Sequence, residues 1–287
     1  MLPPVTVCIA ALCSDHKEPR AVIAADRMVT LGNFIEFEHT VPKMAPASPF
    51  AIALVAGDSL IGNRIAQDVA QSVAASNPPV VEIARALAIQ YEAARQTQLE
   101  EQILKPRGLN LGSYYTNHNT LNGQVMAMLD NQMSQFNLGV ELLIAGVDPS
   151  GAHIHTVHNP GGTERLHDVI GYAAIGSGAI HALQSMIGFR HSRLADYHET
   201  VFRVYASKRR AEVAPGVGQD IDMAVISSDD THWLTDGELE QLSAIYEDFE
   251  SSTSQTLRQK LSNFNLGDGS PIAQGAEDGA LAASTDG

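Results

Sequence analysis

Cysteines, basic residues and long apolar runs are all scarce in this chain, and each scarcity excludes a class of protein. The two cysteines, Cys8 and Cys13, cannot form a disulfide framework, so we expect a protein that is reduced and cytoplasmic. Lysine and arginine together number 18 against 33 acidic residues, which gives a formal net charge of −15. Because nucleic acids and anionic membranes bind clustered cations, the composition predicts no nucleic-acid partner and no membrane partner.

The apolar segments are too short to cross a membrane. The longest one near the N-terminus runs from Val5 to Cys13, no Lys or Arg precedes it, and Asp15 follows it closely. A signal peptide needs a basic start and a spanning helix needs about 20 apolar residues, so the sequence predicts neither. The apolar fraction of 44% is nevertheless enough for a sizeable core.

Short apolar strands alternate with amphipathic helices along the 287 residues. Strands are predicted at 5–13, 21–26, 34–42, 50–56, 141–147, 153–158, 172–175 and 222–227. Helices are predicted at 59–76, 80–104, 121–136, 178–187, 194–212 and from 235 onward, with a loop at 105–120. This order of elements favours an α+β fold in which two sheets pack together and helices cover them.

The C-terminal segment differs in composition from the rest of the chain. Residues 265–287 are mainly Gly, Ala and Ser with four acidic residues and no basic one. We expect a disordered acidic tail there. The remaining 1–264 is predicted to form a single domain with an insert near 96–137.

Six short motifs follow one another at the ends of the predicted strands. They are Thr6–Ala11, Ala24–Arg27, Pro42–Met44, Ala56–Asp58, Leu143–Gly151 and Ala174–Gly178. In this order and spacing they resemble the catalytic β-type subunits of proteasomes. The likeness is greatest to the bacterial proteasome-like peptidases of the HslV type and of the ancestral-beta-subunit group. It covers about residues 5–227, apart from the insert.

The resemblance implies both a fold and a nucleophile. The fold is the four-layer α-β-β-α sandwich of the N-terminal nucleophile hydrolases, and the activity is that of a threonine-type endopeptidase. Thr6 would attack the peptide carbonyl through its hydroxyl, and its own α-amine would take the proton. An α-amine has a pKa of roughly 7.7–8.0, which suits a base near neutral pH. Taken alone, Thr6 is an ordinary β-branched strand residue.

Four further residues match catalytic positions of the family. Lys43 would place a positive charge beside the hydroxyl, Asp26 would pair with Lys43, and the Gly57 N–H would face the developing oxyanion. Ser177 would bond with the threonine amine or with the nucleophilic water. Each has a simpler interpretation as well: Asp26 and Gly57 as turn residues, Lys43 as a solvated loop cation, and Ser177 as a helix N-cap.

Two features depart from the family pattern. The family has an Asp followed three residues later by a Ser, whereas Glu212 stands in place of the Asp and Pro215, which has no hydroxyl, in place of the Ser. Thr6 is also not N-terminal as written. Residues 1–5 must therefore leave, either by self-cleavage after Val5 or through a translation start at position 5.

The resemblance also implies a substrate and partners. Val55, Ala45 and Ser59 would line the primary specificity pocket and favour apolar residues before the cut. The substrate would be an unfolded protein or peptide, processed inside a homo-oligomeric ring that an ATP-dependent unfoldase could serve, with no cofactor and no metal. The alternatives are a non-catalytic scaffold subunit, or an amidohydrolase of the same superfamily that acts on small amides.

Three other groups could carry chemistry, and each also has a simpler explanation. His153, His155 and His158 could bind a metal, but on a strand His158 faces away from the other two, which favours a solvated polar face. The basic run Lys208–Arg210 is typical of a helix C-terminus. Cys8 shares a strand face with Thr6 and could line the pocket.

Overall fold

The computed structural model describes residues 6–15, 18–31, 35–38, 43–117 and 120–264. It separates into two compact units, Met1–Thr235 and Asp236–Gly287. The second unit contains α7 (Asp236–Leu261), a helix that begins with Asp236 and Glu238 and ends with Arg258 and Lys260. These charges complement the helix dipole at both ends. Among the described helices, none has the length and the apolar character that a bilayer crossing requires.

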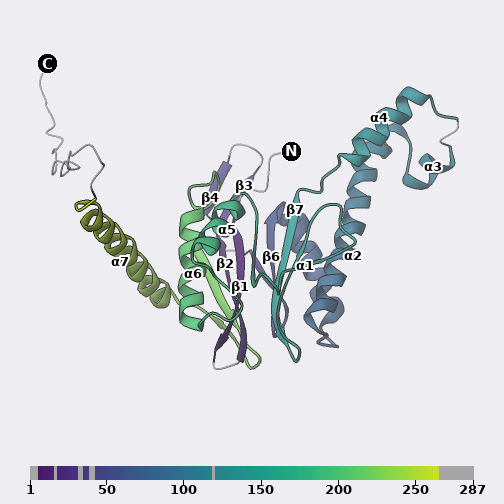
Figure 1. Cartoon of the computed structure of the whole chain (residues 1–287). Coiled ribbons are helices and arrows are strands. Elements are labelled where there is room, and N and C mark those ends of the chain that lie inside the picture. The colour runs from purple at the N-terminus through teal and green to yellow at the C-terminus, as the bar shows by residue number, and fades with distance from the viewer. Residues whose placement is uncertain (1–5, 16–17, 32–34, 39–42, 118–119, 265–287) are drawn as a thin grey trace, which may run out of the picture. The chain divides into compact units, whose positions relative to one another are not determined.

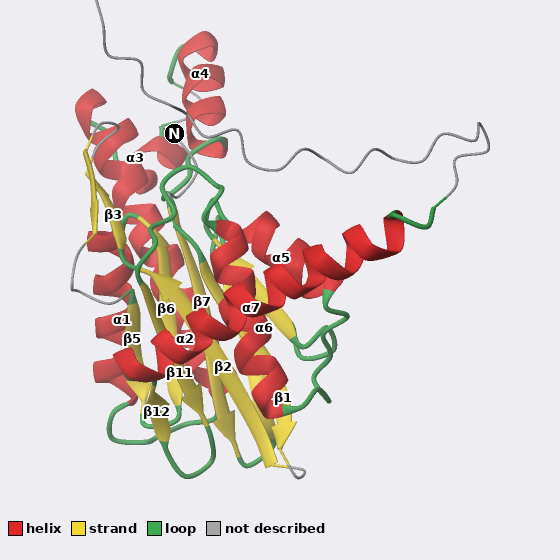
Figure 2. Cartoon of the chain, turned by 90° about the vertical axis from the view of Figure 1, so that its left-hand side faces the viewer, coloured by secondary structure: helices red, strands yellow, loops and turns green. Residues whose placement is uncertain are grey.

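One sheet of the first unit carries the first strand of the chain in its interior. Its order is β10-β1-β2-β11-β12, with every neighbouring pair antiparallel. Ile9 lies opposite Ala24 on one neighbouring strand and opposite Ala174 on the other. Such small side chains leave room for packing on both faces of the sheet. Figure 2 views this sheet from the side of its covering helices. The strands are β1 (Cys8–Asp15), β2 (Glu18–Asp26), β10 (Tyr172–Ile175), β11 (Ile221–Ile226) and β12 (Thr231–Trp233).

The second sheet packs against the first through the main apolar core. Its order is β5-β6-β7-β8-β9, again antiparallel throughout. Alternate residues of both sheets enter one buried cluster, among them Leu12 and Ile23 from the first sheet and Leu54 and Leu143 from the second. The strands are β5 (Met44–Ser48), β6 (Ala51–Gly57), β7 (Val140–Asp148), β8 (Gly151–Val157) and β9 (Arg165–Leu166).

Two pairs of helices cover the outer faces of the sheets. Helices α1 (Ser59–Val73) and α2 (Val80–Leu99) bury their apolar stripes against the second sheet. Helices α5 (Ala179–Gly188) and α6 (Tyr197–Ala211) contact β1, β2 and β10 of the first sheet. Figure 1 shows the resulting sequence of layers, helix, sheet, sheet and helix. The α+β class is therefore confirmed, and the layers are compatible with the predicted sandwich.

The predicted insert near 96–137 is a helical arm on the end of α2. The chain continues through η1 (Glu100–Leu104) and η2 (Lys105–Arg107) to α3 (Leu111–Thr116) and α4 (Gly123–Ser134) (Figure 1). The arm has a small core of its own, formed by Leu99, Ile103, Leu104, Tyr114, Leu129 and Met133. The prediction of a loop at 105–120 was wrong for α3, where Asn110 and Ser113 form a reciprocal capping box.

The structure describes the predicted strand at 34–42 only in part. Its residues 35–38 form β4 (Ile35–Glu38), which pairs with β3 (Met28–Leu31) in a separate two-stranded ribbon. The rest of that prediction, and the predicted acidic tail at 265–287, lie outside the described residues.

Candidate active site

Thr6 lies two residues before the start of β1 and is 1% exposed. Its backbone N–H donates to Ser177 Oγ at 3.1 Å, and its carbonyl accepts from the Gly178 N–H at 3.1 Å. Gly176 approaches so closely that an added Cβ would lie 2.3 Å from the Thr6 carbonyl oxygen. Gly176 has φ of 92°, a backbone conformation that favours glycine. The turn before α5 is thus shaped to hold Thr6.

The Thr6 hydroxyl lies between a cation and an anion. It donates to Asp26 Oδ1 and accepts from the Lys43 ammonium. Lys43 Nζ also donates to both carboxylate oxygens of Asp26 at 3.0 Å each. The Lys43 side chain is 11% exposed and that of Asp26 is fully buried, so water screens this triangle weakly.

Backbone donors hold the Asp26 carboxylate in place. It accepts from the N–H of Val7 at 2.9 Å, of Met28 at 3.0 Å and of Gly218 at 3.2 Å. A buried carboxylate needs such partners because an uncompensated charge is expensive to desolvate. Asp26 is therefore an anchored anion on which the position of Lys43 depends.

Gly57 reaches the same region at the end of β6. The Cys8 thiol lies 3.5 Å from the Val55 carbonyl, so β1 and β6, which belong to different sheets, face each other there. Gly57 has φ of 96°, and the next residue, Asp58, caps α1 by accepting from the N–H of Leu60 and Ile61. Two residues before Gly57, the Val55 N–H donates to the Lys43 carbonyl at 3.0 Å, which ties the end of β6 to the residue that contacts Thr6. The oxyanion role of Gly57 stays a prediction.

The turn that carries Ser177 has a second support that the sequence did not indicate. Glu141, at the start of β7, accepts from the Gly176 N–H at 2.7 Å. His158 faces the same carboxylate at 3.8 Å, and this neighbouring ring is the main cause that holds the Glu141 pKa below its usual range. Glu141 therefore links the second sheet to the turn that touches Thr6.

Glu212 lies at the end of α6, and its partners are the cations of that helix. Its carboxylate accepts from Lys208 at 2.7 Å and pairs with Arg209 at 3.4 Å. Its predicted role at the threonine amine stays a prediction. Lys208 departs from the solvated helix end expected from the basic run, because it is 0% exposed. Nothing in the local sequence distinguishes Lys208 from Arg209, so its burial became visible only in the tertiary structure.

The predicted substrate-binding residues lie beneath α1 or at its start. Val55 is 3% exposed and belongs to the apolar cluster between the second sheet and α1, and Ala45 packs against the same cluster. Ser59 is the first residue of α1. Their role in specificity stays a prediction. Cys8, which was expected to line the pocket, is instead buried in the core between the sheets, and this burial raises its pKa.

A second hydroxyl cluster was not foreseen and lies at the turn between β7 and β8. Ser150 Oγ is 2.8 Å from His153 Nε2, and His153 Nδ1 is 2.6 Å from Asp168. Ser150 also donates to Asp148 at 2.5 Å. The hydrogen bond with Asp168 raises the His153 pKa above its ordinary value.

The expected solvated histidine face is also corrected by the structure. His155 is 2% exposed, and neither of its ring nitrogens has a hydrogen-bond partner. In the part of the chain that the structure describes, no three His, Cys, Asp or Glu side chains converge as a metal site would require.

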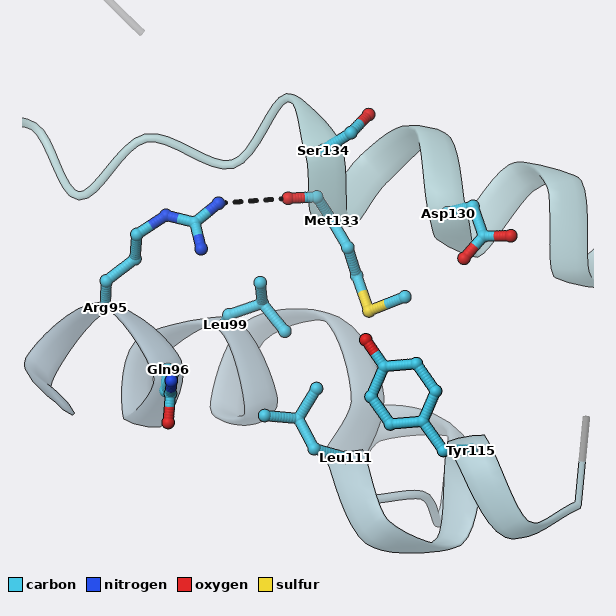
Figure 3. A pocket seen from close by; sticks show the side chains of 8 residues that line it. All are labelled: Arg95, Gln96, Leu99, Leu111, Tyr115, Asp130, Met133 and Ser134. Carbon is cyan, nitrogen blue, oxygen red and sulfur yellow. Dashed lines mark hydrogen bonds between the residues drawn. The ribbon is translucent and has the colours of Figure 1, made fainter. Parts of the chain in front are cut away.

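The helical arm encloses a pocket of about 440 Å³. Figure 3 shows Leu99, Leu111 and Tyr115 on its walls, with Arg95 at one side. The Arg95 guanidinium is already engaged, since it donates to the carbonyls of Met133 and Phe136 and to Asn159. The pocket belongs to the arm, whereas the Thr6 cluster belongs to the sandwich.

Comparison with known proteins gives one partial similarity of note. A stretch of 77 residues is 32% identical to Proteasome subunit beta type-2 of Saccharomyces cerevisiae. The match covers 26% of this chain and only 28% of the length of that protein. No protein-family model matches the chain. The comparison supports a likeness to proteasome-like proteins and leaves the finer grouping as a prediction.

Proposed function

We propose that the chain is a threonine-type endopeptidase subunit with the N-terminal nucleophile hydrolase fold, and that Thr6 becomes its N-terminal nucleophile once residues 1–5 are removed. The observation that carries the proposal is the triangle of Thr6, Lys43 and Asp26 in a buried position. The partial likeness to a proteasome β subunit supports the same class of chemistry.

The surroundings of the Thr6 backbone nitrogen suit an α-amine as well as an amide. Ser177 Oγ lies 3.1 Å from that nitrogen, and Ser177 in turn donates to the Pro215 carbonyl at 3.3 Å. With residues 1–5 removed, the same nitrogen would be an amine that Ser177 orients. The nearby Lys43 charge would favour the neutral amine, because like charges disfavour ionisation.

The reaction then follows in two steps. The amine takes the hydroxyl proton while Thr6 Oγ1 bonds to the substrate carbonyl carbon, and Lys43 stabilises the negative charge that develops on Oγ1. The Gly57 N–H would donate to the oxyanion. Breakage of the peptide bond transfers the proton to the leaving amine and leaves an ester on Thr6. Water, deprotonated by the Thr6 amine, hydrolyses that ester and restores the enzyme.

A site of this kind would cut any unfolded chain that reached it, so we further propose sequestration in a homo-oligomeric ring. The substrate is an unfolded protein or peptide, and an ATP-dependent unfoldase is the matching partner class.

The test is hydrolysis of casein and of small amides by the natively expressed protein, alongside reaction with a peptide epoxyketone. We expect casein cleavage and covalent labelling, both abolished by Thr6→Ala. Cleavage of small amides alone would favour an amidohydrolase with the same nucleophile. Folded protein that neither cleaves nor reacts would favour the scaffold subunit.

A further inference from the structure

Lys208 is a fully buried cation whose three donors are all engaged. The side chain is 0% exposed, and Nζ donates to Glu212 Oε1 at 2.7 Å, to the Gly218 carbonyl at 2.9 Å and to the Gln219 carbonyl at 2.6 Å. Since an ammonium has three N–H bonds, these contacts satisfy it completely. Burial lowers the Lys208 pKa, while the hydrogen bond with Glu212 opposes that change.

The segment that Lys208 holds, residues 212–219, touches the Thr6 site at two points. The Gly218 N–H donates to Asp26 Oδ2 at 3.2 Å. The Pro215 carbonyl lies 3.3 Å from Ser177 Oγ, which is equally close to the Thr6 carbonyl. One short segment therefore contacts both the carboxylate that positions Lys43 and the hydroxyl that faces the Thr6 nitrogen.

This segment gains little from regular structure. It lies between α6 and β11, and it contains Gly216 at φ of 72° and Gly218. Glycine residues leave the backbone many conformations, so external contacts must select one. An apolar residue in place of Lys208 would leave two buried carbonyls and the Glu212 carboxylate without this donor, and such losses are expensive.

We propose that Lys208 is a positioning residue of the Thr6 site, which acts with Glu212 to hold the Gly218 N–H on Asp26 and the Pro215 carbonyl on Ser177. The inference rests on the proposed function of Thr6 and assigns Glu212 a role through Lys208. Lys208 makes no hydrogen bond with Thr6, and its contacts reach the site through this segment, while its charge also interacts with Asp26.

Several charged groups share the region and set the expected pH response. They are Asp26 from β2, Lys43 before β5, Glu141 from β7, and Lys208, Arg209 and Glu212 around the end of α6. Removal of the Gly218 N–H would loosen the Asp26 carboxylate and with it Lys43, whose charge favours the neutral Thr6 amine. The acid limb of the pH profile, which reports protonation of that amine, should therefore move to higher pH when the segment is released.

The experiment compares Lys208→Met with Lys208→Arg, Glu212→Gln and the matched control Val204→Ala. Val204 is 0% exposed and lies one turn earlier on α6. For each variant we would measure kcat and KM for a peptide, the rate of epoxyketone labelling against pH, and amide hydrogen exchange over 212–222.

For Lys208→Met we expect faster exchange over 212–222, kcat lower by about 10²-fold with KM little changed, and an acid limb at higher pH. Lys208→Arg, which keeps the charge and several donors, should recover most of the pH profile. Glu212→Gln should shift the profile less and in the same direction. Val204→Ala should lower stability without moving the profile, because its cavity is apolar.

The proposal is overturned if Lys208→Met keeps the wild-type pH profile, or if Val204→Ala reproduces the shift. If Lys208→Met fails to fold, the Glu212→Gln variant provides the test. An unchanged pH profile of labelling in Glu212→Gln would then contradict the proposal. A wild-type protein that never labels would refute the function proposed for Thr6 instead. In that case hydrogen exchange over 212–222 still tests whether Lys208 holds this segment. Faster exchange in Lys208→Met would support that role, and unchanged exchange would contradict it.

Discussion

Two clusters of this molecule each join a hydroxyl, a basic nitrogen and a carboxylate, and their surroundings differ. In the first, Thr6 is buried and its hydroxyl contacts Lys43 and Asp26 directly. In the second, Ser150 lies in an exposed turn, and its hydroxyl contacts His153 and Asp148.

The contacts of the second cluster indicate a structural role, which is to connect neighbouring elements of the fold. Ser150 donates its only hydroxyl proton to Asp148, so His153 Nε2 is left to donate to Ser150. The raised His153 pKa favours the protonated ring, which cannot serve as a base. Asp148 also accepts from the N–H of Val80 at the start of α2. The cluster thus joins the β7–β8 turn to α2.

The two clusters share residue types but differ in their surroundings, so residue types alone do not define a catalytic cluster. The Thr6 hydroxyl belongs to a residue whose own nitrogen Ser177 holds, and its neighbours Gly176 and Asp26 are fixed by Glu141 and by three backbone donors. We therefore expect substitutions in the first cluster to change the reaction and those in the second to change stability alone.

The largest expected effect is that of removing each hydroxyl. Thr6→Ala should lower peptide hydrolysis by roughly 10⁴-fold or more and abolish epoxyketone labelling, because the nucleophile is gone. Ser150→Ala should leave both at the wild-type level. Steady-state kinetics and intact mass after labelling measure these changes, and a loss of hydrolysis in Ser150→Ala would reverse the assignment.

The next effect concerns the two basic groups. Lys43→Met should lower kcat by about 10²–10³-fold, because the charge beside the Thr6 hydroxyl is lost. Asp26 keeps its three backbone donors in this variant, so we expect it to fold. His153→Gln should change kcat less than about twofold. Equal kcat losses in the two variants would remove the distinction between the clusters.

Glycine substitutions separate crowding from backbone strain. Gly176→Ala combines a positive φ with a contact of 2.3 Å to Thr6, so it should cost about 2 kcal/mol or more and also slow labelling. Gly151→Ala meets open space at φ of 138° and should cost only about 1 kcal/mol. Urea unfolding and labelling rates measure both, and normal labelling in Gly176→Ala would contradict close packing on Thr6.

The smallest effect is a pH dependence in the second cluster. Because the folded His153 pKa is raised, the stability it contributes is fully present below its unfolded pKa of about 6.5 and is lost as pH rises through the folded pKa. The difference in unfolding free energy between wild type and His153→Gln should therefore shrink as pH rises. A difference in unfolding free energy that stays constant from pH 5 to pH 9 would contradict this structural role of His153. A change in kcat that follows the same pH dependence would contradict it as well.

The sequence predicted most of the first cluster because its members stand at strand ends. The resemblance of its motifs to proteasome β-type subunits led us to expect Thr6, Asp26, Lys43 and Ser177 together, and the structure brings these four together. Short apolar runs and turn residues likewise predicted most strands of both sheets, but they missed β5, β9 and β12. Local periodicity determines such elements, so they can be recognised without tertiary information.

The supporting residues could not be predicted in the same way. Lys208 looks like any basic residue in the last turn of a helix, and only the fold of 212–219 over it explains its burial. Asp168 meets His153 across the β8–β9 connection, where no periodicity applies. The arm helix α3 was missed because its six residues show no amphipathic stripe and depend on capping by Asn110.

The central claim is that Thr6 acts as an N-terminal nucleophile. The most direct test is the intact mass and N-terminal sequence of natively expressed protein after reaction with a peptide epoxyketone, which bonds to both the amine and the hydroxyl of an N-terminal threonine. We expect the mass and the N-terminal sequence to show a chain that begins at Thr6 and carries one probe molecule. A chain that retains residues 1–5 and carries no probe would contradict it.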